Sequence, residues 1–309
     1  MAIKLGSTTI NGLYLGSTAI NKAYLGATEV FTTSGAFTPA SLFASGEKGA
    51  WYDPSDLMTM WTDTAGTTQA TVGDEVARID DKSGNGNHAT QATFAARPIL
   101  RQTGGGLYYL EFDGTDDVLL MGDVFDAKIA TASGKWDTYA AASYDADGIL
   151  LAKLGDSNQG ENQRQYASLR RAFGKTAQVA LYDLARTPIE FTRVVGSAVS
   201  AGQNYVFRSV FDHDLAASGT TANDSSRHKM WKDGVLETLT VDASSGNLGT
   251  VQNGTAQLSI GGAYGTSGPI NLPFSGKLFG LITLAGVVES DAVADEVEAY
   301  LAAKSGVTL

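Results

Sequence analysis

The sequence predicts an all-β protein, in which short β-turn repeats precede an antiparallel β-sandwich and one helix closes the chain. Three observations support this fold class. Residues 1–34 repeat a decapeptide, residues 41–309 alternate short apolar runs with Gly, Asn and Asp turns, and the 309 residues include 36 glycines. Gly and Asn favour turns, whereas β-branched and aromatic residues favour strands. A chain of this length can also bury a substantial core.

Near-copies of one decapeptide occupy the N-terminal segment, residues 1–34. Residues 5–14 read LGSTTINGLY, residues 15–24 read LGSTAINKAY, and a third copy starts as LGATEVF before it breaks off. Each unit is too short to enclose a core, so the segment needs a partner surface. That surface belongs to further copies of the chain or to another protein, and a flexible low-complexity tail is the alternative. Residues 35–40 are the expected linker, and residues 41–309 the sandwich.

Within the sandwich, short apolar runs bounded by turn residues predict antiparallel strands. The Asp-Gly pair at 113–114 predicts the end of another strand, and the glycines of the loop 83–87 require positive φ angles. The expected strands are Ile149–Leu151, Val179–Tyr182, Phe191–Val195, Tyr205–Phe211, Lys229–Trp231, Leu258–Ile260 and Leu278–Leu284.

One helix is predicted near the C-terminal end. Ser290 can cap its first turn, Asp291 lies near its positive end, and Lys304 and Gly306 are typical of a helix end. Its apolar residues share one face, so we expect them to pack on the sandwich: Val293, Val297, Tyr300 and Leu301.

Composition and charge exclude several classes of protein. The 22 basic and 33 acidic residues give a net charge of −11, whereas a nucleic-acid-binding protein needs a basic surface. No window approaches the roughly 18 apolar residues of a membrane span. Met1–Lys4 is not followed by the apolar run of a secretory signal. The absence of cysteine excludes disulfides and thiolate metal sites.

Six motifs, taken in chain order, carry a family resemblance. They are Trp51–Leu57, Asp81–Gln91 with Arg97-Pro98 behind it, Leu110–Asp117, Met230–Val235, Leu258–Gly262 and Phe274–Gly280. Together they resemble the concanavalin A-like lectin/glucanase group, in its laminin-G-like branch. The resemblance implies an antiparallel jelly-roll sandwich from about Ser41 to the end. It leaves function open, because this sandwich serves lectins, hydrolases, lyases and adhesion modules alike.

The N-terminal repeats resemble the N-terminal segments of tailed-phage fibre and spike proteins. This resemblance implies a virion surface protein, a tail fibre or head spike of a phage or gene transfer agent, made in the bacterial cytoplasm without a signal peptide. Residues 1–34 would attach to other virion proteins, and the protein would form a homotrimer or another homo-oligomer. The sandwich would bind host-surface polysaccharide for adsorption. A purely structural decoration protein without a ligand is an alternative.

Sugar binding requires an aromatic ring beside hydrogen-bonding side chains, because a sugar stacks its C–H face on the ring while its hydroxyls form hydrogen bonds. The loops 155–166 and 262–266 fit this pattern, and Trp136 is expected near the same end of the sandwich. A hydrophilic connection without a ligand explains the loop 155–166 equally well. Trp51 and Trp231 are expected in the core, and Arg170-Arg171 is a basic spot for an acidic sugar or for solvent. The predicted ligand residues are Asn158, Gln159, Asn162, Arg164, Tyr166, Tyr264 and Trp136.

Catalysis is the second hypothesis. Glu111 and Asp113 lie two apart on a predicted strand and share a face, as the acid and nucleophile of a capsule-degrading hydrolase could, with carboxyls about 5 Å apart. We favour the alternative, in which Asp113 ends a strand and Asp116 and Asp117 are solvated or bind a cation. The protein is therefore expected not to be an enzyme.

Metal binding is limited to calcium in this interpretation. The family resemblance suggests a calcium ion, for which Asp145 and Asp147 offer oxygen ligands, although structural turns explain them equally well. The three histidines, His88, His213 and His228, lack a metal-binding spacing and are expected on the surface.

Overall fold

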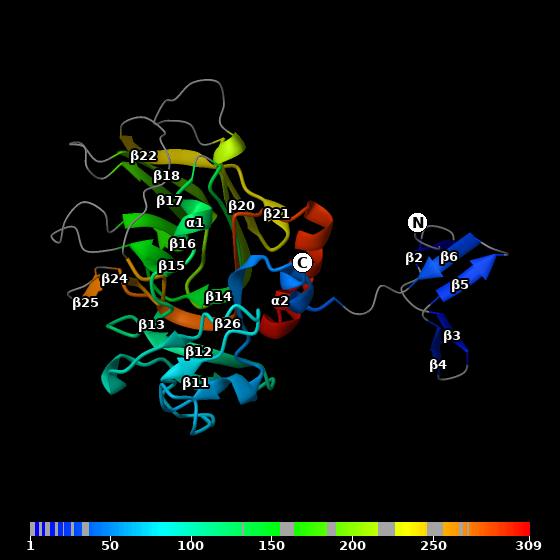
Figure 1. Ribbon diagram of the computed structural model, residues 1–309, viewed down its shortest axis with the longest axis horizontal. Coiled ribbons are helices and arrows are strands. Elements are labelled where there is room, and N and C mark those ends of the chain that lie inside the picture. Colours follow the sequence, from blue (N-terminus) through cyan, green and yellow to red (C-terminus); the bar gives the residue numbers. More distant parts are fainter. Residues whose placement is uncertain are drawn as a thin grey trace.

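The computed structural model describes residues 4–309 apart from short segments, the longest being 155–163, 184–189, 216–225 and 246–255. In the N-terminal repeats it describes backbone strands, the blue arrows of Figure 1. These form three separate antiparallel pairs: β1 (Lys4–Leu5) with β2 (Thr8–Thr9), β3 (Leu13–Leu15) with β4 (Thr18–Ile20), and β5 (Lys22–Leu25) with β6 (Thr28–Thr32). The hairpins thus recur once per repeat, and the second and third span the junctions between successive units.

The first sheet of the sandwich, here called the helix-side sheet, contains eight strands that pair antiparallel throughout. Its central strands are long, and β7 pairs with β26 alongside the main order. In spatial order the strands are β11 (Ile99–Gln102), β12 (Tyr108–Asp113), β26 (Ser275–Ala285), β14 (Lys135–Tyr144), β19 (Asn204–Asp212), β20 (His228–Lys232) and β21 (Val235–Leu236), with β7 (Lys48–Tyr52).

The second sheet, here called the outer sheet, contains ten antiparallel strands, and several of them are only two residues long. The strands β24 (Ala263–Gly265) and β25 (Gly268–Ile270) form a separate hairpin, which follows β23 of this sheet in the sequence. In spatial order the strands are β22 (Thr240–Ser245), β18 (Glu190–Ala198), β17 (Lys175–Asp183), β16 (Arg164–Ala172), β15 (Gly148–Leu154), β23 (Ser259–Ile260), β13 (Leu119–Leu120), β10 (Ala89–Thr90), β9 (Arg78–Ile79) and β8 (Met60–Trp61).

Two apolar cores hold these layers together. The first core lies between the sheets, where Trp136 and Phe211 of the helix-side sheet meet Leu151 and Ile260 of the outer sheet. The second core lies on the other face of the helix-side sheet, under α2 (Asp291–Ser305). Gly280 allows α2 to approach, because a Cβ there would lie 2.8 Å from Leu301 Cδ2. The architecture is therefore helix on sheet on sheet, with α2 drawn red in Figure 1.

Shorter helical turns complete the fold. The α-helix α1 (Asp126–Ile129) is a single turn, and four 3₁₀ turns occur in the connections. The first 3₁₀ turn follows Phe37, which packs against the second core, so apolar packing starts a few residues before Ser41. The 3₁₀ turns are Pro39–Phe43, Leu57–Thr59, Phe94–Ala96 and His213–Leu215. Within the described residues, no helix has the length and apolar character of a membrane span.

The predicted fold class is confirmed: the protein is an antiparallel β-sandwich with one C-terminal helix. Each strand expected in the second half of the chain lies within or overlaps an observed strand, from β15 to β26. Ser290 occupies the N-cap of α2, and Gly306 follows the helix with a φ of 72°. The expected face packs as predicted, since Val297 and Leu301 are buried and Val293 and Tyr300 are half-buried against the second core.

Candidate functional site

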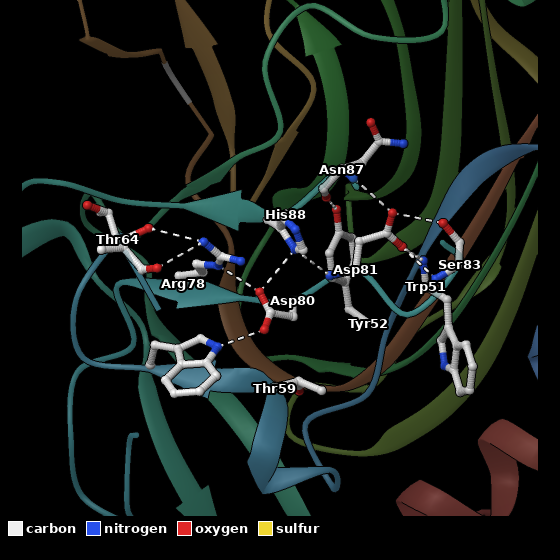
Figure 2. A network of polar contacts seen from close by, with 12 residues as sticks. Trp51, Tyr52, Thr59, Thr64, Arg78, Asp80, Asp81, Ser83, Asn87 and His88 are labelled. Atoms are coloured by element: carbon white, nitrogen blue, oxygen red, sulfur yellow. Dashed lines mark hydrogen bonds and ion pairs between the residues drawn. The ribbon is translucent and has the colours of Figure 1, made fainter. Parts of the chain in front are cut away.

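The loop between β9 and β10, residues 80–88, is built around the buried carboxylate of Asp81. Its Oδ1 accepts hydrogen bonds from the backbone amides of Trp51, at 3.0 Å, and Ser83, at 2.9 Å. Its Oδ2 accepts hydrogen bonds from the Ser83 hydroxyl at 2.8 Å and from the backbone amide of Asn87 at 2.9 Å. Figure 2 shows these bonds converging on one side chain. A buried carboxylate with four donors is stable because its lost hydration is replaced.

Neighbouring side chains fix both ends of this loop. Asp80 accepts hydrogen bonds from Arg78 Nε at 2.6 Å and Trp61 Nε1 at 2.8 Å, and its Oδ1 lies 3.0 Å from His88 Nδ1. The Tyr52 hydroxyl donates to the carbonyl oxygen of Asn87. Burial and the nearby Asp81 carboxylate raise the pKa of Tyr52 well above its usual value, so the hydroxyl keeps its proton as a donor. The network is drawn in Figure 2.

Asn85 and Asn87 are held against the start of β7 by their amide nitrogens. Asn85 Nδ2 donates to the carbonyl oxygens of Glu47, at 3.0 Å, and Gly49, at 3.2 Å. Asn87 Nδ2 donates to the same Gly49 oxygen at 2.8 Å. The expected positive φ angles occur at Gly84, +85°, and at Gly86, +76°. The amide oxygens of both asparagines accept no hydrogen bond within the described residues, so they are available to a ligand.

The segment leading into α1 faces these asparagines and is anchored by a buried lysine. Lys153 of β15 donates to the Asp123 carboxylate, to the Val124 carbonyl oxygen at 3.0 Å and to the Asp126 carboxylate at 3.0 Å. Between them, Phe125 has φ 74° and ψ −2°, a left-handed conformation that costs a bulky residue about 1–3 kcal/mol. The anchors on either side fix this backbone turn, and the Phe125 side chain packs in part against the first core.

A pocket of about 270 Å³ lies between the loop and this segment. We call it the Phe125 pocket. Its size is slightly below the roughly 300–1,000 Å³ of sites for drug-sized ligands, which suits a ligand built around one sugar ring. An aromatic ring, two amides and two ammonium groups line it together with small apolar side chains: Lys48, Asn85, Asn87, Val124, Phe125, Ala127 and Lys128.

Most of the predicted sugar-binding residues have no described side chain. Asn158, Gln159 and Asn162 lie outside the described residues. Arg164 and Tyr166 belong to β16, where the backbone is described but these side chains are not. Tyr264 is half-buried on β24.

The prediction for Trp136 is wrong. This residue is fully buried in the first core, where its ring stacks on Phe211 at 4.3 Å between centroids. Its neighbour Tyr139 is equally buried and donates its hydroxyl to Asp137 at 2.9 Å. Both residues lie on β14, a central strand with sheet or helix on either face, so neither ring can reach a ligand. Trp51 is buried as expected, and Trp231 is half-buried.

The expectation for the histidines holds only in part. His88 is half-exposed, but His228 lies on β20 and is buried between the sheets, with Nδ1 2.9 Å from Gln178 Oε1 of β17. The polar residues around it suggested a loop. Pairing of β20 with β19 opposite Phe211 instead turns the imidazole into the first core.

The carboxylates suggested for catalysis occupy ordinary structural positions. Glu111 forms an ion pair with Arg101 of β11, with Oε2 2.8 Å from Nε, and both side chains are exposed. Asp113 Oδ1 accepts from the Thr115 amide at 2.7 Å, as expected for the turn that ends β12. Asp117 is buried, and desolvation together with the charges of Asp113 and Asp116 raises its pKa to about 7, although the Asp113 amide donates to it.

The sequence suggested two places for a cation, at Asp145 with Asp147 and at Asp116 with Asp117. Both oxygens of Asp147 already accept hydrogen bonds, from Arg171 and from the amides of Phe173 and Gly174. The Asp145 amide donates to a carbonyl oxygen of β26. Instead, carboxylate oxygens of Asp113, Asp116 and Asp117 lie within 4.8 Å of one another. A calcium ion stays a prediction at either place.

The Phe125 pocket itself was not predicted. The loop 81–91 was recognised as a family motif, and its Asn and Gly content was visible, but it was assigned to the fold. Nothing in the sequence around Phe125 indicates that this segment faces the loop, because the contact depends on the anchor from Lys153.

Comparison with known proteins gives weak similarities. No protein-family model and no curated protein matches the chain. Among solved structures, it is similar to the Trypanosoma rangeli sialidase in complex with the inhibitor DANA, at 10% identity and a TM-score of 0.43, over 90% of this chain and 35% of the sialidase. The chain therefore spans about a third of that enzyme.

Two smaller domains are similar over nearly their whole length. Domain 4 of an extracellular arabinanase from Geobacillus stearothermophilus, in complex with arabinotriose, has 13% identity and a TM-score of 0.42, over 81% of this chain and 98% of that domain. A CBM40 module of Ruminococcus gnavus sialidase, bound to α2,3-sialyllactose, has 14% identity and a TM-score of 0.41, over 66% and 97%. The sheet topology, and not these distant similarities, establishes the fold as an antiparallel β-sandwich.

Proposed function

We propose that the sandwich binds one sugar residue of a surface glycan in the Phe125 pocket and does not cleave it. The observation that carries this proposal is the ring of Phe125, held in a left-handed backbone conformation opposite two asparagines whose amide oxygens are free to accept hydrogen bonds. Stacking on the ring and hydrogen bonds to the amides are the contacts that a sugar requires. A residue of Phe125's bulk in such a conformation is expected where the position of the ring matters.

The test is direct binding to the full-length protein. Glycans from bacterial capsule and lipopolysaccharide would be screened on an array, and hits would be measured by calorimetry. Phe125→Asn should lower affinity about tenfold or more, because a half-buried aromatic contact contributes roughly 1.5–3 kcal/mol. Asparagine tolerates the left-handed conformation, so this variant keeps the backbone.

Phe173→Asn is the matched control. Phe173 also has a positive φ, +53°, but lies exposed at the β16–β17 turn and does not line the pocket. Equal affinity of the Phe125→Asn variant and the native protein for every bound glycan would overturn the proposal. So would array binding that the Phe173 variant loses and the Phe125 variant retains.

The absence of cleavage is part of the proposal. Glu111, the carboxylate that a capsule-degrading hydrolase would use, forms an ion pair with Arg101. Incubation with a bound polysaccharide should release no new reducing ends. Release that disappears in Glu111→Gln would establish the capsule-degrading hydrolase instead.

We further propose that the protein belongs to the surface of a tailed phage or a phage-like particle. Support comes from the N-terminal repeats alone, and the comparisons add none. The hairpins recur once per repeat, and an isolated two-stranded hairpin is marginally stable in water. A partner surface, from other copies of the chain or from other virion proteins, would supply the missing packing. A homotrimer is the proposed assembly, and adsorption to host polysaccharide the proposed role.

A further inference from the structure

Two positively charged side chains line the Phe125 pocket, although the protein as a whole is acidic. The chain has a net charge of −11, yet the charged groups that line this pocket are the ammonium groups of Lys48 and Lys128. Neither lysine forms an ion pair within the part of the chain that the structure describes, whereas Lys82, Lys135 and Lys153 all do. Two ammonium groups without an ion-pair partner in the described residues therefore lie beside a cavity of sugar-ring size.

The backbone brings the two lysines to the same end of the helix-side sheet. Lys48 begins β7 and pairs with Ala285 at the end of β26. Gly286 follows directly with a φ of +84°, and the stem of Lys128 lies over it. A Cβ on Gly286 would be 3.0 Å from Lys128 Cδ and 3.2 Å from its Cβ. The absence of a side chain at this position therefore lets the Lys128 stem approach the strand end beside Lys48.

Within the described residues, no nearby carboxylate forms an ion pair with Lys48 or Lys128. Asp123 and Asp126, which flank Phe125, are bound to the buried ammonium group of Lys153. The Glu47 carboxylate accepts a hydrogen bond from the Ser45 amide at 2.9 Å. These carboxylates offset positive charge in the region as a whole, but their oxygens are directed to Lys153 and to a backbone amide. The ammonium groups of Lys48 and Lys128 are therefore free to contact a ligand directly.

We propose that the sugar bound in the Phe125 pocket carries a negatively charged group, a carboxylate or a sulfate, which Lys48 and Lys128 recognise. This inference rests on the proposed sugar binding and adds the class of sugar. A hydrogen bond to a charged group is stronger than one between neutral groups, so the loss of one lysine should lower affinity about tenfold or more. The negative charge of the whole protein repels polyanions elsewhere, so selectivity for an acidic sugar must arise locally.

The experiment uses the full-length protein and matched pairs of oligosaccharides. Oligogalacturonate is compared with its methyl ester, hyaluronan oligosaccharides with their methyl esters, and sulfated galactan oligosaccharides with the desulfated forms. At least one charged member should bind about tenfold more tightly than its neutral counterpart. The carboxylated and sulfated pairs separate the two sources of charge. Raising the salt concentration should weaken the charged member selectively.

The variants are Lys48→Met and Lys128→Met, which keep most of the apolar stem, and Lys128→Arg, which keeps the charge. The methionine variants should remove the preference for the charged member, and the arginine variant should restore part of it. Lys229→Met, at an exposed lysine on β20 away from the pocket, should change nothing. Folding of each variant is checked by its thermal unfolding midpoint.

The outcomes separate this inference from the proposed function. Binding that depends on Phe125 but is indifferent to ligand charge and to both lysines would overturn the acidic-sugar inference and leave sugar binding intact. Binding of an acidic sugar that neither Phe125→Asn nor the lysine variants affect would overturn both for this pocket. Failure of every glycan on the array and of every charged oligosaccharide to bind would likewise overturn both.

Discussion

The guanidinium of Arg208 on β19 and the carboxylate of Asp137 on β14 form an ion pair beneath α2, with side chains 2% and 0% exposed. Arg208 Nε and Nη2 lie 3.1 and 2.9 Å from the two carboxylate oxygens. The pair also binds both polar backbone atoms of Glu289, just before α2 begins. It therefore fixes where the helix starts on the sheet.

Loss of one partner should be costly. Arg208→Met leaves a buried carboxylate without its counter-ion, so we expect the free energy of unfolding to fall by about 3–5 kcal/mol. Urea denaturation measures this change. The double variant Asp137→Leu with Arg208→Met removes both charges and should recover a large part of the loss. A single-variant loss below about 1 kcal/mol would contradict the role given to the pair.

The carboxylate of Asp81 should control ligand affinity through the loop 80–88. Asp81→Asn replaces an acceptor oxygen by a donor, so it breaks part of the four-bond network and should cost about 1–3 kcal/mol of stability. Sugar affinity should fall with it, because Asn87 loses its support. Asp63→Asn is the control, since Asp63 also accepts bonds from Thr67 and Thr68 but in a separate turn. If both variants change affinity equally, the loop does not position the ligand.

Gly286→Ala should weaken the binding of an acidic sugar without touching the ligand. The new methyl group displaces the Lys128 stem, and the positive φ adds strain. Gly202→Ala has the same kind of strain, with φ +72°, but its nearest contact is an ordinary 3.7 Å to Asp145. Both variants should therefore lose similar stability, about 1 kcal/mol, while only the first loses affinity for the charged member of each pair. Identical affinities would show that the place of Lys128 is irrelevant.

Asp117 should make the protein less stable as pH rises from about 4 to about 7. Its folded pKa, raised to about 7 by desolvation first and by Asp113 and Asp116, exceeds the value near 3.9 of an unfolded aspartate. Between these two pH values the unfolded chain has lost a proton that the folded protein keeps. The stabilisation that the protonated Asp117 contributes is therefore complete below about pH 4 and lost above about pH 7.

Asp117→Asn tests this dependence. In this variant, the free energy of unfolding should fall less between pH 4 and pH 7, by about 1 kcal/mol or more. Chemical denaturation at several pH values measures the slope, and NMR of the native protein measures the pKa. In Asp116→Asn, where one repelling charge is gone, the Asp117 pKa should fall while the slope survives in weaker form. An unshifted Asp117 pKa in the native protein would refute the prediction.

Residues 1–34 should be needed for assembly and not for the fold of the sandwich. The described residues that build both apolar cores lie between Phe37 and Val307. A chain that starts at residue 35 should keep the thermal unfolding midpoint of the sandwich but lose oligomerisation and incorporation into particles. Mass measurement of both proteins at micromolar concentration tests the proposed trimer. A full-length protein that stays monomeric alone and on the particle, or normal incorporation of the shortened chain, would contradict the proposal.

The amino-acid sequence by itself determined the local structure. Strands such as 205–211 and 278–284 could be located because alternating apolar residues and glycine turns act over a few positions. The helix at 291–305 could be located from its apolar face and from Gly306, whereas Ser290 marks its start without a side-chain capping hydrogen bond. The positive φ angles of Gly84 and Gly86 were also predictable, since only the local backbone decides them.

Tertiary structure alone decided the site. The Phe125 pocket joins Lys48, the loop 80–88 and α1, segments that meet because β7 pairs with β26 and because Lys153, from a third segment, anchors the residues before α1. Trp136 and His228 looked suited to the surface and are buried, because pairing with β19 turns both side chains toward the opposite sheet. Periodicity reports which residues share a face, but the contacts that assemble a binding site run between segments far apart in the chain, and those depend on how the sheets pack.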